Sequence, residues 1–176
     1  MDKKVWIAGA SGLVGGMLLE KLIKHPNIKE IHSFGRKFLK VESHKINQHQ
    51  VDFSTSSVPL SILPHGSPQV AICCLGTTIR KAGTPEKFSQ IDWHAVISFA
   101  REAYKAGASQ FVVVSALGAD PQSKVFYNRV KGNMERDLQS IGFASLLIFR
   151  PSLLIGPRPE WRIGERIAQK IVTSFK

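Results

Sequence analysis

Short apolar runs alternate with amphipathic segments along nearly the whole chain. The apolar runs have strand length and predict strands at residues 5–8, 28–34, 45–51, 70–75, 111–114 and 146–149. Helical spacing of apolar residues predicts helices at residues 13–24, about 85–106, 126–139 and 163–172. Strands that alternate with helices are typical of a parallel sheet with crossover helices, so we expect an α/β fold.

Proline, glycine and capping residues mark where several of these elements begin and end. Pro26 follows the first helix, and Thr84-Pro85 has the form of an N-cap followed by a first-turn proline. Gly107 is expected to end the helix that begins there. Residues 76–83, between the fourth strand and this helix, are expected to form a loop.

The length of 176 residues and the 43% hydrophobic composition favour one domain, residues 1–176, with a substantial core. No apolar run approaches the ~20 residues that span a bilayer. The N-terminus leads directly into the first strand rather than into a cleavable signal. We therefore expect a cytoplasmic protein without a membrane span.

The formal net charge of +11 raises the question of a nucleic-acid partner, because clustered cations bind phosphate backbones. The cations crowd both ends of the chain without forming a recognisable DNA-binding helix or aromatic platform. We expect a solvated basic surface and no specific nucleic-acid partner, with some charge left to receive an anionic cofactor.

Cysteine and histidine are not arranged for metal binding or disulfide formation. Cys73 and Cys74 are adjacent in a predicted strand, so their side chains point to opposite faces and are expected to pack in the core. The six histidines show no metal-ligand spacing with carboxylates or cysteines. We expect no metal site.

A glycine-rich turn with G-x-x-G-x-x-G spacing separates the first strand from the first helix. Glycine allows a tight turn and close approach to a pyrophosphate, whose charge meets free N–H groups at the positive end of the helix. At this position the motif favours a dinucleotide site over a structural turn, within a doubly wound, mostly parallel Rossmann-type sheet. The candidate cofactor-binding residues here are Gly9, Ser11, Gly12, Leu13, Val14 and Gly15.

Arg36 and Lys37 follow the second strand, at the position that usually selects between dinucleotides. A carboxylate there would repel a 2′-phosphate, whereas two cations favour NADP(H) over NAD(H). The alternative is an ordinary solvated basic turn. Asp52 is placed to accept from the adenine amine, and Leu75-Gly76 to pass beside the adenosine ribose; either could instead be an ordinary strand end.

Tyr127 and Lys131 are one helical turn apart on one face of a predicted helix. A tyrosine exchanges protons poorly at neutral pH, and an adjacent ammonium stabilises the phenolate and eases that exchange. Ser115, at the end of the fifth strand, could hydrogen-bond the same substrate oxygen. The spacing alone is mostly structural, but with the glycine loop and Ser115 it makes these three residues catalytic candidates.

Several longer stretches resemble the short-chain dehydrogenase/reductase superfamily, and within it the atypical branch of Tat-interacting oxidoreductase-like proteins. The resemblance covers nearly the whole chain and is carried by GASGLVGG, FGRK, CCLGTT, KAG at Gly83, SALGAD, YNRVKGNME and RPSLLIGPRPEWRIGE. It implies NADPH held by residues 11–14, Arg36, Lys37 and the Leu75-Gly76 turn, with Tyr127 as proton donor or acceptor.

The same resemblance implies that Lys131 holds the nicotinamide ribose and tunes Tyr127, and that the backbone near Leu154 approaches the nicotinamide. It also implies that Arg162 contacts a cofactor phosphate, for which a surface charge is the alternative. Many superfamily members have an asparagine in the helix after the fourth strand, where this chain has Asp92. The chain stops where related proteins continue, so we expect part of the C-terminal substrate-covering region to be lacking.

Three functions agree with these residues. The first is an NADPH-dependent oxidoreductase that transfers hydride to or from an unidentified carbonyl or alcohol. The second is a non-catalytic NADPH-binding module that regulates or binds a protein partner. The third is a nucleotide-sugar epimerase or dehydratase, which uses the same tyrosine and lysine but for which little chain length is left.

Overall fold

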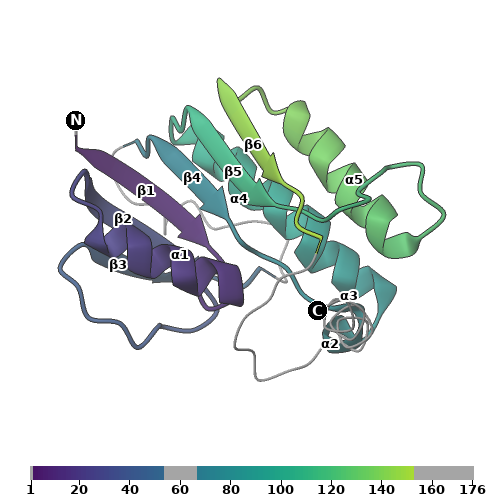
Figure 1. The fold of residues 1–176 in the computed structure, drawn as a ribbon, viewed down its shortest axis with the longest axis horizontal. Coiled ribbons are helices and arrows are strands. Elements are labelled where there is room, and N and C mark those ends of the chain that lie inside the picture. The colour runs from purple at the N-terminus through teal and green to yellow at the C-terminus, as the bar shows by residue number, and fades with distance from the viewer. Residues whose placement is uncertain (1, 54–66, 153–176) are drawn as a thin grey trace, which may run out of the picture.

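Six parallel strands form one sheet in the part of the chain that the computed structural model describes, residues 2–53 and 67–152 (Figure 1). Across the sheet their order is β3, β2, β1, β4, β5, β6, which confirms the predicted doubly wound α/β fold. The strands are β1 Lys3–Ala8, β2 Ile28–Gly35, β3 Ile46–Gln50, β4 Val70–Cys73, β5 Gln110–Val114 and β6 Ser145–Phe149. The strand order reverses between β1 and β4, and sheets of this kind bind ligands outside the carboxyl ends of the strands at that point.

Helices cover both faces of the sheet, as Figure 1 shows. Helix α1 (Leu13–Lys24) packs Leu19 against Ile7 and its neighbours on one face. Helices α4 (Ala95–Lys105) and α5 (Phe126–Gln139) lie on the other face, where Phe99 and Met134 join the cluster around Trp6. Successive β1 residues therefore enter different cores, as the period of a strand buried on both faces requires.

The helix predicted over residues 85–106 begins as expected but is divided, so the prediction of one regular helix was wrong. The Thr84 hydroxyl accepts a hydrogen bond from the Lys87 N–H at 3.2 Å and opens the first piece. The pieces are α3 Pro85–Ser89, the π-helical segment η2 Gln90–His94, and α4 Ala95–Lys105. Such single-turn π segments occur frequently at functional sites, and this one carries the buried Asp92.

A short helix, α2 (Ile79–Ala82), lies where a loop was predicted. The Thr78 hydroxyl accepts from the Lys81 N–H at 3.1 Å, and Gly83 ends the helix with a positive φ of 84°. Apolar periodicity cannot reveal so short a helix.

The helix predicted at 163–172 lies outside the described residues. Among the described helices, none is long and apolar enough to cross a membrane.

Candidate dinucleotide-binding site

The glycine loop brings the end of β1, the start of α1 and the chain after β4 into backbone contact. Gly9 has a φ of +82°, and a Cβ placed on it would lie 2.6 Å from the carbonyl carbon of Cys74. A Cβ on Gly15 would lie 2.3 Å from the carbonyl oxygen of Gly9. Gly12 is the N-cap residue of α1, and as a glycine it has no side chain to cap the N–H groups of the first turn. Close backbone packing therefore leaves no room for a side chain at position 9 or 15, which keeps the loop tight at the start of α1.

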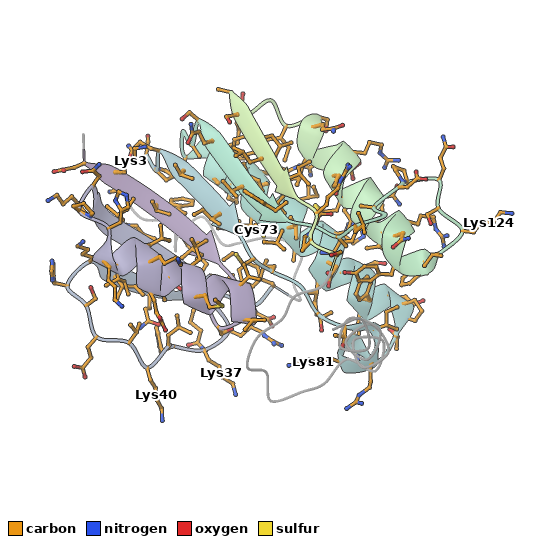
Figure 2. The ribbon with its side chains drawn as sticks, in the orientation of Figure 1. Lys3, Lys37, Lys40, Cys73, Lys81 and Lys124 are labelled. Atoms are coloured by element: carbon orange, nitrogen blue, oxygen red, sulfur yellow. The ribbon has the colours of Figure 1, made fainter. Side chains whose placement is uncertain are left out.

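A small depression lies between this loop and the end of β2. The residues that line it are Ala10, Ser11, Ser33, Phe34, Gly35, Lys37, Phe38, Leu39, Gln48 and His49. Two predicted cofactor residues from separate motifs, Ser11 and Lys37, thus line the same depression. Arg36 is exposed next to Lys37, and Figure 2 shows the Lys37 side chain extending away from the ribbon.

The other predicted cofactor residues, Asp52, Leu75 and Gly76, are not among the residues that line the depression. Asp52 is exposed just beyond the end of β3, between two buried residues. Leu75 and Gly76 form the turn after β4, and the backbone nitrogen of Leu75 lies against the Gly9 position. Leu154 and Arg162 lie outside the described residues, so their predicted roles stay predictions.

Lys131 is held by a buried ion pair that the sequence did not reveal. Its Nζ lies 2.7 Å from Oδ1 of Asp92, and the two side chains are only 4% and 2% exposed. The other carboxylate oxygen, Oδ2, accepts a hydrogen bond from the Thr77 N–H at 2.8 Å. Asp92 also lies against the Leu75-Gly76 turn, because a Cβ on Gly76 would be 3.4 Å from Oδ1 of Asp92. One carboxylate thus connects α5, η2 and the predicted ribose-binding turn.

The two remaining catalytic candidates lie on separate elements, Tyr127 in α5 and Ser115 directly after β5. Tyr127, in the first turn of α5, is partly buried, and its ring lies 5.5 Å from that of Phe88. Ser115 follows β5 and is 5% exposed, and within the described structure its Oγ is buried without a hydrogen-bond partner. A buried hydroxyl without a partner is costly, so this atom is suited to meet a polar group of a ligand.

The cysteines next to the site have inert thiols. Burial raises the pKa of Cys73 to about 12 and that of Cys74 to about 11, so neither forms a reactive thiolate near neutral pH. Figure 2 shows Cys73 within the sheet, in agreement with the predicted packing role. Within the described residues, no group of three or more histidine, cysteine or acidic side chains is arranged to hold a metal ion.

Sequence reasoning missed three contributors to the site's architecture. In the sequence, Asp92 is a departure from a family pattern and Thr77 lies in a predicted loop, and neither position indicates the contact between them. Gly132, beside Lys131 in α5, allows the chain at Asp120-Pro121 to pass against the helix, since a Cβ there would lie 2.2 Å from the Pro121 nitrogen. A glycine inside a helical pattern is a readable signal of such close approach.

The strand order, the closely packed glycine loop and the Ser115 hydroxyl, which has no hydrogen-bond partner among the described residues, together define a dinucleotide-binding protein of the Rossmann class, and a nicotinamide dinucleotide fits the residues present. Comparison with known proteins agrees with this class. The chain belongs to the NAD dependent epimerase/dehydratase family, whose model matches residues 5–176.

Two relatives and one solved structure illustrate the similarity. Protein HTATIP2 of Rattus norvegicus is 35% identical over 178 residues, which cover 99% of this chain and 72% of that protein. Protein FMP52, mitochondrial, of Candida albicans is 34% identical and covers 94% of this chain and 74% of that protein. The enzyme WbmH of Bordetella bronchiseptica, solved in complex with NAD+, has a TM-score of 0.78 at 13% identity, covering 99% of this chain but 64% of that one. The last similarity therefore concerns the fold alone.

Proposed function

We propose that the protein is an NADPH-dependent oxidoreductase of the atypical short-chain dehydrogenase/reductase type. The observation that carries the proposal is the depression that the glycine loop shares with the basic segment after β2. Its wall combines Ser11 of the phosphate-binding turn with Lys37, and no carboxylate is among the residues that line it. A 2′-phosphate would meet the Lys37 ammonium there, with the exposed Arg36 next to it in the chain, which supports NADPH over NADH.

In this proposal the chain's own groups orient the cofactor and handle one proton. When bound, NADPH supplies the hydride. Lys131 would hold the nicotinamide ribose from α5, while the backbone of the Leu75-Gly76 turn would pass beside the adenosine ribose. Tyr127 would give a proton to the carbonyl oxygen of the substrate, and the Ser115 hydroxyl would donate a hydrogen bond to that same oxygen.

The catalytic part is tested by Tyr127→Phe in a screen of carbonyl substrates with NADPH. We expect loss of turnover with NADPH affinity preserved, since only the phenol hydroxyl is removed. Tyr104→Phe is a matched control, because Tyr104 is the other tyrosine of the chain and is 45% exposed. Equal turnover in Tyr127→Phe and wild type would contradict the role of Tyr127. Turnover of a nucleotide sugar instead would favour the epimerase or dehydratase alternative.

The cofactor preference is tested by Arg36→Glu, which places an acid where the 2′-phosphate is expected. We expect NADPH affinity to fall at least tenfold and NADH affinity to change much less, because NADH lacks that phosphate. Lys124→Glu is a control with the same change of net charge at another exposed position, preceding α5. Unchanged NADPH affinity in Arg36→Glu would count against the preference.

A second candidate is a non-catalytic NADPH-binding module that regulates or binds a protein partner. The observation that favours it is the buried Asp92–Lys131 pair, because an ammonium already neutralised by a carboxylate stabilises a nearby phenolate less well. NADPH binding without turnover in the substrate screen would support this candidate.

The proposed cytoplasmic location is tested by imaging a tagged protein; a mitochondrial signal would contradict it.

A further inference from the structure

The basic segment that follows β2 is fastened to the edge strand β3 by side-chain amides. Gln48 of β3 pairs with the backbone of Leu39 in both directions: its Oε1 accepts from the Leu39 N–H at 2.6 Å, and its Nε2 donates to the Leu39 carbonyl at 3.1 Å. Gln50, two residues on, donates from Nε2 to the Arg36 carbonyl at 3.1 Å. The segment 36–39 is therefore held at both ends.

This fastening matters because the segment has no helix or strand structure of its own. Arg36, Lys37 and Phe38 are exposed, and Phe38 is 65% exposed. Only the Leu39 side chain packs against the core under α1. Gly35 before the segment is paired with β3, and Leu39 packs on the core, but within the described structure Arg36 and Lys37 themselves make no such contact. Without the glutamine amides the backbone of these two residues would be less ordered, and ordering it when a phosphate binds would reduce the affinity.

The location of the fastening connects it to cofactor choice. Gln48, Lys37 and Phe38 line the same depression as Ser11 of the glycine loop. Gln48 is opposite Ser33 in the β2–β3 register, so it is fixed by the sheet itself. Strand β3 thus fixes, through Gln48, the position of the segment that carries Arg36 and Lys37 relative to the phosphate-binding turn.

We infer that Gln48 is a positioning residue that sets the selectivity for a 2′-phosphorylated dinucleotide by fixing the Arg36–Lys37 segment beside the glycine loop. The inference rests on the proposed NADPH preference. Gln50 acts in the same direction through the Arg36 carbonyl, from a more exposed position. Gln48 itself lines the depression whereas Gln50 does not, and both are inferred to act through the cations that they hold in place.

The test compares NADPH and NADH affinities of the wild type, Gln48→Met and Asn47→Ala by fluorescence titration. Gln48→Met keeps the length of the side chain and removes both hydrogen bonds, and Asn47→Ala changes an exposed neighbour on the same strand. The NADPH-to-NADH affinity ratio is expected to fall roughly tenfold in Gln48→Met, because the released segment would have to be ordered when the 2′-phosphate binds, and to stay at the wild-type value in Asn47→Ala. Hydrogen exchange of the Leu39 amide is expected to accelerate in Gln48→Met alone.

The outcomes separate this inference from the proposed function. A wild type without NADPH preference overturns both, whereas faster Leu39 exchange with an unchanged ratio overturns only the link to selectivity. Equal losses of NADPH and NADH affinity would show a merely structural role and also overturn the inference. If Gln48→Met does not fold, Gln50→Ala removes the bond to Arg36 from the exposed side, and an unchanged ratio there overturns the inference as well.

Discussion

Replacing Asp92 with leucine should cost a large part of the stability of this protein. The change leaves the Lys131 ammonium, 4% exposed, without its carboxylate and removes the acceptor of the Thr77 N–H. Removing one member of a buried ion pair typically costs about 3–5 kcal/mol. Domains of this kind are stable by roughly 5–15 kcal/mol in total. For a chain of this length, the loss corresponds to a decrease in Tm on the order of 6–20 °C.

Urea unfolding of a double-mutant cycle measures this cost. Lys131→Met alone leaves the carboxylate buried and unpaired, and it should be similarly destabilising. The double variant Asp92→Leu/Lys131→Met places two apolar groups side by side, so it should be more stable than the sum of the single effects by at least ~2 kcal/mol. Lys29→Ala is the exposed control, since its 4.0 Å pair with Asp2 is 58% and 72% exposed and should contribute at most about 1 kcal/mol.

Two results would refute this reasoning. A loss below about 1 kcal/mol in Asp92→Leu would mean that the pair contributes no more than a surface salt bridge. Strict additivity in the cycle would mean that Asp92 and Lys131 act independently, and the carboxylate would then not be what holds the lysine in α5.

Three further changes test other contacts. Gly15→Ala should abolish NADPH binding in a titration, because its Cβ would lie 2.3 Å from the Gly9 oxygen, while Gly16→Ala, whose Cβ would keep 3.4 Å from Ala10, should bind normally. Gly132→Ala should lower the free energy of unfolding by roughly 1–3 kcal/mol or more through overpacking against Pro121, and an unchanged urea midpoint would contradict this. Burial lowers the pKa of His32 from its ordinary 6.5, against the opposing effect of Glu30, so the unfolded chain binds the proton first. The contribution of neutral His32 to the free energy of unfolding should be complete above about pH 6.5 and should decline below that pH. His32→Gln should therefore reduce the pH dependence of the free energy of unfolding, measured with urea between pH 7.5 and 5.5.

The elements that the sequence predicts well are those governed by local signals. The bounds of α1 and α5 are confirmed, because apolar spacing and flanking residues determine them over several turns. The π segment η2 could not be foreseen. Its backbone departs from the regular helix where Asp92 meets Lys131, and that partner lies on a helix distant in the chain. Periodicity carries no information about such a contact.

In the candidate site, too, local motifs are predictable from the sequence and contacts between distant segments are not. The glycine loop and the cations after β2 are short, local motifs, and in the structure Ser11 and Lys37 line the same depression. The spacing of Tyr127 and Lys131 indicated a shared helical face but not what lies against it. The carboxylate of Asp92 and the amide of Gln48 become visible only when strands and helices far apart in sequence are packed together.

The most direct test of the central claim is a titration of the purified protein with NADPH and, separately, with NADH, followed by calorimetry. We expect saturable binding of NADPH at one site and weaker binding of NADH, because Lys37 lines the same depression as Ser11 of the glycine loop and Arg36 precedes Lys37 directly. Absence of binding for both dinucleotides would contradict the proposed cofactor site, and equal affinities would contradict the role assigned to these two cations.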